Sequence, residues 1–217
     1  MSFVQHTLFS LSIAIGVVIG WIRFRKTDPA FLPFLLLLTT GLLNELTGLF
    51  VMLRGQNNTV NYNIYSLAEP ILITWQFHRW KLFNGRNRLY FLLQSTYVLV
   101  WATEYALATE SHLFNSYFQI LYSFAIVVMS IMMINRLLFS VTRSLFTDAT
   151  FLICMGLVLY FLYAILLEAF WLYGLNKSRV FQLRIYYLMS YINLFTNIIF
   201  ALATLWMPLK RRYIMRC

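Results

Sequence analysis

Seven long apolar runs follow one another along this chain of 217 residues, with only short polar gaps between them. A helix needs about 20 predominantly apolar residues to cross the hydrocarbon core of a bilayer. Because lipid offers the backbone no hydrogen-bond partners, each run is expected to be an α-helix. The pattern predicts an all-α polytopic membrane protein, a bundle of seven transmembrane helices in one domain over 1–217. The expected spans are 3–21, 31–53, 62–77, 89–107, 117–138, 151–173 and 183–209.

The composition excludes a water-soluble protein. Hydrophobic residues make up 61% of the chain and charged residues only 11%, whereas a water-facing shell requires about a quarter of the residues to be charged. The net charge of +10 does not indicate nucleic-acid binding, because the Lys and Arg residues lie in short clusters beside the apolar runs. Such clusters are typical of membrane topology.

The distribution of basic residues predicts the orientation of the chain. Cytoplasmic connections carry an excess of Lys and Arg. Thirteen of the 17 Lys and Arg residues follow the first, third, fifth and seventh runs, which places the N-terminus outside and the C-terminus in the cytoplasm. The first run is expected to be a retained span rather than a signal peptide, because Met1 to Thr7 contains no Lys or Arg. The basic residues on the outer side are Arg54, Lys177, Arg179 and Arg184.

Four of the seven acidic residues, Glu45, Glu69, Glu104 and Glu168, lie within apolar runs or at their edges. The predicted orientation places all four in the outer half of the membrane. A charge in hydrocarbon costs several kcal/mol, so such residues usually face the bundle interior, pair with a cation or stay protonated. Glu45 and Glu69 are expected to face the interior. Glu104 and Glu168 are shallower: either they only extend to the headgroups, which the sequence favours, or with Arg184 they form a shallower rim of the pocket.

Polar side chains share helical faces with the two deeper acids, at spacings of three, four or seven residues. We expect these faces to line one outward-opening pocket for a ligand or cation. The alternative is that the polar groups only hydrogen-bond between helices, at about 0.6 to 2 kcal/mol each. The predicted pocket residues are Asn44, Glu45, Asn63, Tyr65, Glu69, Asn193 and Asn197.

Small residues mark expected helix contacts. Gly16 and Gly20 form a GxxxG motif, which indicates either a homodimer face or close packing within the chain. Gly41 and Gly48 lie on the face of Glu45 and are expected to allow close packing there. Pro70, next to Glu69, removes a backbone donor from its helix, which either shapes that helix or assists transport.

The sequence contains no motif of a known catalytic or cofactor site. HExxH, GxSxG and phosphate-binding glycine loops are all missing from it. Cys154 and Cys217 have neither a disulfide framework nor metal-ligand spacing. The sequence therefore predicts a protein that is not an enzyme and that has no cofactor and no metal site.

The chain resembles a widespread uncharacterised family of short bacterial seven-span integral membrane proteins. The resemblance rests on the order and spacing of several short elements. Departures are Pro70 and Phe200, the latter where a tyrosine is expected. The resemblance implies a bacterial inner-membrane location and a seven-helix bundle, with no established activity. The matching elements are Glu45 with Gly48, Asn63-Ile64-Tyr65 with Glu69, Gly156 with Tyr160, and Asn193 with Asn197.

These features favour a non-enzymatic membrane sensor or accessory protein. Its short cytoplasmic loops cannot hold a catalytic unit, so it would act through a cytoplasmic effector protein. The alternative is a small proton, cation or solute transporter or channel using Glu69 beside Pro70. A third hypothesis is an intramembrane lipid-modifying enzyme with Glu45 and Glu69 as acid and base. Transport would need polar residues in the inner half, for which the candidates are Gln76, Gln94, Asn197 and Thr204.

Overall fold

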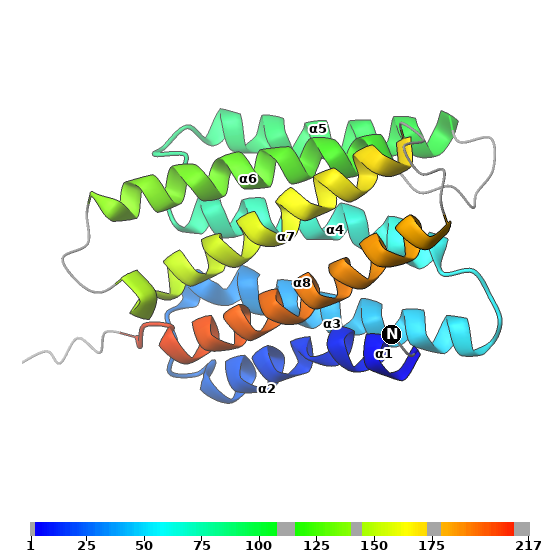
Figure 1. Cartoon of the computed structure of the whole chain (residues 1–217). Helices are drawn as coiled ribbons and strands as arrows, with labels where there is room; N and C mark the ends of the chain where they lie inside the picture. Colours follow the sequence, from blue (N-terminus) through cyan, green and yellow to red (C-terminus); the bar gives the residue numbers. More distant parts are fainter. Residues whose placement is uncertain (1–2, 108–115, 140–144, 173–178, 211–217) are drawn as a thin grey trace, which may run out of the picture.

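The computed structural model describes residues 3–107, 116–139, 145–172 and 179–210. Within these ranges the chain is helical throughout, apart from short connections and one isolated bridge between Thr27 and Leu209 (Figure 1). The all-α prediction is therefore confirmed. The helices are α1 (Phe3–Leu11), α2 (Ile13–Arg23), the 3-10 helix η1 (Pro29–Phe31), α3 (Leu32–Leu53), α4 (Thr59–Arg79), α5 (Asn87–Leu107), α6 (Ser116–Leu138), the 3-10 helix η2 (Leu145–Thr147), α7 (Ala149–Leu172) and α8 (Arg179–Trp206).

Each expected span coincides with helix in the structure, but the first is interrupted. It divides into α1 and α2 at Ser12, whose hydroxyl donates a hydrogen bond of 2.6 Å to the Phe9 carbonyl. A hydroxyl that bonds back to its own helix competes with the regular backbone pattern, which explains a local break at this position.

Five helical segments in the described ranges are long and apolar enough to cross a membrane, which indicates a membrane protein. The helices α4 and α5 are more polar. In α4 the polarity comes from side chains such as Asn63, Glu69 and Gln76, all buried in the bundle. Seven spans therefore stay a prediction. The five segments are Gln5–Arg23, Pro29–Leu53, Ser116–Leu138, Ala149–Phe170 and Tyr187–Trp206.

The helices form a closed ring. Around it, α2 packs on α3, α3 on α4, α4 on α6, α6 on α7, α7 on α8, and α8 returns to α2, while α1 contacts α3 and α8. Helix α5 packs on the outside of the ring, against α4 and α6 (Figure 1). Helices far apart in the sequence therefore surround a common centre.

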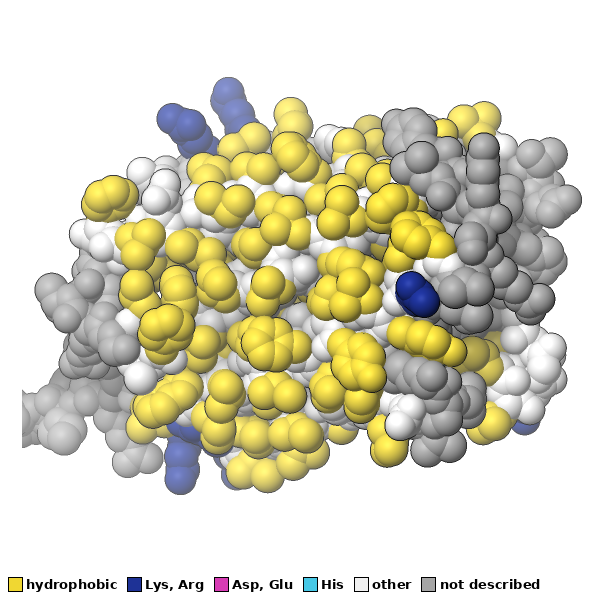
Figure 2. Space-filling model, in the orientation of Figure 1, with side chains coloured by type: hydrophobic (Ala, Val, Ile, Leu, Met, Phe, Trp, Pro, Cys, Tyr) yellow, Lys and Arg dark blue, Asp and Glu magenta, His cyan; other side chains and the backbone are white. Residues whose placement is uncertain are grey.

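The surface of the ring is apolar, and its interior combines a hydrophobic core with buried polar side chains. Helix α6 buries Ser123 and Ser130 completely, whereas Phe124, Ile131 and Met132 are exposed. Figure 2 shows one face of the bundle covered by hydrophobic side chains, with Lys and Arg toward its ends. Exposed apolar area on this scale requires a nonaqueous environment or a partner, and lipid around the described helices satisfies that requirement.

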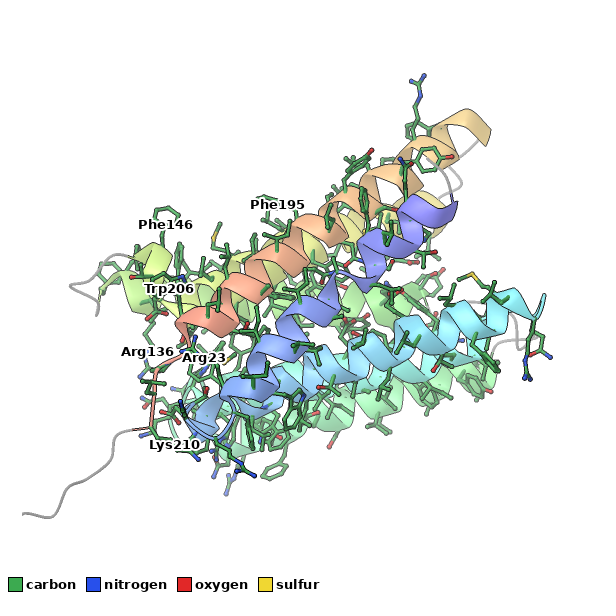
Figure 3. The ribbon with its side chains drawn as sticks, turned by 90° about the horizontal axis from the view of Figure 1, so that it is seen from below. Arg23, Arg136, Phe146, Phe195, Trp206 and Lys210 are labelled. Carbon is green, nitrogen blue, oxygen red and sulfur yellow. The ribbon has the colours of Figure 1, made fainter. Side chains whose placement is uncertain are left out.

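One end of the bundle collects basic residues. Arg23, Arg136 and Lys210 lie together there (Figure 3). The Arg23 guanidinium donates to the Leu205 carbonyl, and the Arg136 guanidinium donates to the Lys81 carbonyl at 2.8 Å. These contacts bring the connections after the first, third, fifth and seventh expected spans to the same end, as the charge pattern requires.

The α7–α8 contact depends on a glycine. A Cβ at Gly156 would lie 2.5 Å from Cε1 of Phe200, whose ring packs edge-on against Phe34 at 5.2 Å. Overpacking costs about 1–3 kcal/mol, and alanine returns about 1 kcal/mol of helix propensity. We therefore expect Gly156→Ala to lower the free energy of unfolding by up to about 2 kcal/mol, measured by reversible unfolding in mixed micelles.

The matched control is Gly16→Ala, where the added Cβ would lie 3.3 Å from Cδ1 of Leu38. We expect this variant to keep its stability or gain slightly from helix propensity. Equal losses for the two substitutions would contradict the role of Gly156.

Candidate functional site

A polar cavity lies at the centre of the ring and has a volume of about 90 Å³. Its walls come from α1, α2, α3, α4, α7 and α8. This volume holds several water molecules but is well below the roughly 300 Å³ of pockets for drug-sized ligands. The site therefore suits a solute of a few heavy atoms. Its polar lining residues are Ser10, Asn44, Glu45, Tyr62, Tyr65, Glu69, Tyr160, Asn193, Thr196 and Asn197.

Glu69 is the most enclosed acid of the cavity, with 7% of its surface exposed. The Tyr65 hydroxyl donates to Glu69 Oε1 at 3.1 Å, and the Tyr122 hydroxyl donates to Glu69 Oε2 at 2.9 Å. Tyr65 lies one helical turn before Glu69 on α4, so the helix itself places the first donor. The second donor comes from α6. Both carboxyl oxygens are thus oriented by buried phenols.

Glu45 enters the same cavity from α3. It is half-buried and hydrogen-bonded to the side chain of Ser10 from α1. One turn earlier, a Cβ at Gly41 would lie 2.9 Å from Cδ1 of Ile13 and 3.4 Å from the Tyr65 hydroxyl. Glycine at this position therefore makes room for the Ile13 side chain of α2, and the Tyr65 hydroxyl lies at ordinary contact distance from the same point.

The lining contains no counter-charge for the acids. None of the described residues around the cavity is Lys, Arg or His. A buried ionised carboxylate requires a paired charge or strong hydrogen bonds. The pocket is therefore acidic and uncompensated by its own walls, which favours either protonated carboxyls or a bound cation.

The α8 wall carries amide and hydroxyl groups. Asn197 Nδ2 donates to Ser12 Oγ at 3.0 Å, so the break between α1 and α2 is tied to α8. Thr196 is only 2% exposed, and its Oγ1 has no hydrogen-bond partner within the described part of the chain. A buried hydroxyl left unpaired costs about 1–3 kcal/mol. We therefore expect Thr196 Oγ1 to bond to a molecule in the cavity.

Six of the seven predicted pocket residues line this cavity; Asn63 does not. Its backbone carbonyl accepts hydrogen bonds from Trp101 Nε1 and from the Ser66 hydroxyl, both at 2.8 Å. On α4 the cavity face is formed by Tyr62, Tyr65 and Glu69, and Asn63 lies about 100° around the helix from Tyr62. The prediction for Asn63 is therefore wrong. Asn44 does line the cavity and accepts a 2.9 Å hydrogen bond from the Asn61 side chain.

The predicted rim residues lie outside the cavity lining. Glu104 caps the start of α6, where its two carboxyl oxygens accept from the Tyr117 and Phe118 amides at 3.1 and 2.7 Å. Backbone amides at a helix N-terminus bind anions well, which explains this position. Glu168 is buried and hydrogen-bonded to the side chain of Ser116, so the prediction that it reaches the headgroups is wrong. Arg184 is exposed on α8.

The predicted packing glycines contact neighbours within the chain. Gly16 faces Leu38 and Ala201, and Gly20 faces Leu35 and Thr204. The GxxxG motif thus points toward α3 and α8 of the same molecule, and these contacts favour packing within the chain over a homodimer face. Gly48 lies against the Asn58 side chain, at the entry to α4.

The polar lining does not continue into the half of the bundle near the basic end. Gln76 binds backbone groups at the start of α3, since it accepts from the Phe34 amide and donates to the Ala30 carbonyl, both at 2.8 Å. Gln94 donates to the Ile71 carbonyl, and Thr204 bonds within its own helix. Apolar side chains close the cavity at this depth, namely Ile73, Phe161 and Phe200 of the lining, with Phe34 against Phe200.

Tyr122 and Tyr160 are site residues that the sequence analysis did not identify. Both lie in apolar runs rich in aromatic residues, where spacing and polarity do not distinguish them from core; Tyr160 entered only as an element of the family resemblance. Within the described residues, no group of three or more His, Cys, Asp or Glu side chains could hold a metal ion.

The Tyr122–Glu69 bond can be tested by removing one oxygen. We expect Tyr122→Phe to lower the free energy of unfolding by about 1–2 kcal/mol, because a buried acceptor loses its donor. The control is Tyr97→Phe. Tyr97 is as buried as Tyr122, at 1% exposed, but its hydroxyl has only a 3.5 Å contact with Thr74. A loss for Tyr97→Phe as large as that for Tyr122→Phe would argue against the special role of the Glu69 bond.

Comparison of the chain with protein families, with curated proteins and with solved structures found no match. The resemblance drawn from the sequence therefore stays a hypothesis. The function has to be argued from the cavity itself, that is, from its acids, its unpaired hydroxyl and its closed apolar end.

Proposed function

We propose that this protein is a seven-span, non-enzymatic sensor or accessory protein of the bacterial inner membrane. Its acidic pocket opens to the outside, binds a small ligand or cation, and changes the activity of a cytoplasmic partner. The observation that carries the proposal is the convergence of Glu45 and Glu69, from two helices, on one cavity whose described lining holds no basic side chain.

The proposal includes α4 and α5 as membrane spans. Each has 21 residues, which corresponds to about 31 Å of helix and matches a hydrocarbon core of about 30 Å. The polar groups of α4 face the interior, whereas α5 exposes Phe91, Leu92 and Leu99. Both helices therefore present a surface compatible with lipid.

The pocket lies in the half of the bundle away from the basic end. Tyr62 is in the first turn of α4, at the opposite end of that helix from Arg79. Because Lys and Arg accumulate on the cytoplasmic side, the pocket half is assigned to the outside. A ligand would then arrive from the periplasmic face.

A partner is proposed because the connections between helices at the basic end are too short to hold a catalytic unit. Those at the basic end between described helices are short; the one between α4 and α5 is Trp80 to Arg86. A binding event in the pocket can change the cytoplasmic end only by shifting the helices of the ring. The basic end is where such a shift would reach another protein.

The transport and enzyme hypotheses have less support. Three of the four side chains expected for an inner polar route, Gln76, Gln94 and Thr204, bind backbone carbonyls or amides instead of lining the cavity. An enzyme would need an acid and a base acting on a lipid, but both oxygens of Glu69 already accept phenolic hydrogen bonds. The geometry favours a binding pocket.

The outward opening can be tested by labelling a cysteine at Thr196, in a chain with Cys154→Ala and Cys217→Ser. We expect Thr196→Cys to react in intact cells with membrane-impermeant methanethiosulfonates, and faster with the cationic ethyltrimethylammonium reagent than with the anionic ethylsulfonate. The acids of the pocket concentrate cations. Adduct mass in purified protein measures the reaction.

The matched control is Ser123→Cys, since Ser123 is completely buried on α6 and does not line the cavity. This position is expected to stay unlabelled. Labelling of Thr196→Cys only in inverted vesicles, or equal rates for the two reagents, would contradict an outward-facing acidic pocket.

The transport alternative predicts a different result in proteoliposomes. We expect protein-loaded and empty vesicles to show the same proton and potassium fluxes under gradients of either sign, because the cavity is closed by apolar side chains at one end. The flux is read with a pH-sensitive dye and a potassium electrode. A flux that Glu69→Gln abolishes and Glu168→Gln leaves intact would establish transport instead.

A further inference from the structure

We infer that the ligand of the pocket is a small alkylammonium ion that carries at least one N–H donor. This inference rests on the proposed function and adds the chemical class of the ligand. Three properties of the cavity support it: its charge, its unpaired acceptor and the mixture of polar and apolar groups in its walls.

The charge of the cavity calls for a cation. Glu45 and Glu69 both line it, and no described lining residue is basic. The Tyr65 hydroxyl donates to Glu69 and lies near Gly41, which is one helical turn before Glu45 on α3. A cation in this space would neutralise the buried negative charge, whereas an anion would add to it.

The second observation is independent of the acids. Thr196 is a lining residue of the cavity, and its buried Oγ1 lacks a partner in the described structure, where the residue is 2% exposed. A hydroxyl oxygen accepts a hydrogen bond from an N–H group. An ammonium ion with an N–H can donate to this oxygen while its charge offsets a carboxylate, whereas a quaternary ion supplies the charge but no donor.

The walls favour an organic cation over a metal ion. Calcium takes about six to eight oxygen ligands, but here both oxygens of Glu69 are already engaged by phenols. Much of the remaining wall is aliphatic or aromatic, and methyl groups pack well on such surfaces. Aromatic rings also attract cations. The apolar and aromatic lining includes Ile13, Leu37, Leu38, Leu157, Tyr160 and Phe161.

The size of the cavity limits the ligand. A volume of about 90 Å³ accommodates a few heavy atoms, which excludes peptides, nucleotides and lipids. Trimethylammonium is a suitable probe because it combines one N–H donor, a positive charge and three methyl groups. Tetramethylammonium differs from it by the loss of the donor, and tert-butanol is a neutral molecule of similar shape.

The test is isothermal titration of the full-length protein in lipid nanodiscs with trimethylammonium chloride near neutral pH. We expect saturable binding of trimethylammonium, at least about tenfold weaker binding of tetramethylammonium, and none of tert-butanol. Binding of magnesium or calcium instead, equal binding of tert-butanol, or no binding of any alkylammonium ion would overturn the inference.

Replacing single acids by Gln tests whether trimethylammonium binds in this cavity. Glu69→Gln and Glu45→Gln are each expected to weaken trimethylammonium binding more than about thirtyfold, because each removes a buried charge partner. Glu168→Gln is the matched control: it removes a buried acid outside the lining and should leave the affinity within about twofold. Equal losses for all three variants would show that the cation responds to overall charge only.

Thr196→Val separates the hydrogen bond from the charge. Because Oγ1 has no partner in the described chain, this variant is expected to fold with undiminished thermal stability, yet to bind trimethylammonium about tenfold more weakly. Unchanged affinity for trimethylammonium would contradict the N–H donor.

The trimethylammonium titration and the cysteine labelling test two different claims, the class of ligand and the outward-facing pocket. If Thr196→Cys reacts from outside but no alkylammonium ion binds, the outward-facing pocket stands and its ligand belongs to another class. If the labelling fails as well, the proposed function falls together with the inference.

Discussion

The buried carboxyl of Glu69 is the group around which the ring is organised. Its two hydrogen bonds, from Tyr65 on its own helix and Tyr122 on α6, hold an acid in the interior of a bundle whose outer surface is apolar. Such an acid requires donors, and the two phenols supply one to each carboxyl oxygen. The polar cavity lies beside this carboxyl, with Tyr65 and Glu69 in its lining. Glu45 and the α8 residues complete its walls, so one costly burial determines where a small molecule can bind.

The other buried polar side chains hydrogen-bond to backbone groups and do not line a polar route through the bundle. Gln76 holds the start of α3, while Trp101 and Gln94 bind carbonyls of α4 on either side of Pro70. In lipid an unsatisfied backbone group is expensive, and these side chains add hydrogen bonds to backbone groups inside the bundle. Polar residues of this kind look identical in a sequence to residues that line a pore. The structure separates the two roles because it shows both partners of each bond.

Much of the architecture was predictable because apolar run length determines helices in lipid. The helix bounds, the gathering of basic connections at one end and the shared cavity of Glu45 and Glu69 follow from run length, charge count and helical phase. Three features could not be predicted: the break at Ser12, the cap that Glu104 forms on α6, and the places of Tyr122 and Tyr160 at the site. Each depends on a neighbour more than ten residues away or on a competing local bond. Asn63 was misplaced because it was chosen from the family resemblance, whereas the helical row of Glu69 passes through Tyr62, about 100° around α4 from Asn63.

The first connection and the segment after α8 pair with each other: the Asp28 amide donates to the Pro208 carbonyl at 3.0 Å, and the Lys210 amide donates to the Lys26 carbonyl at 2.8 Å. The two paired segments lie about 180 residues apart in the sequence, and contacts between such distant segments form slowly because a long loop has to close first. Helix α8, which brings Asn193, Thr196 and Asn197 to the cavity, is therefore expected to dock late in folding. The wall that carries the amide and hydroxyl groups then completes the cavity only after the helices with the two acids have packed.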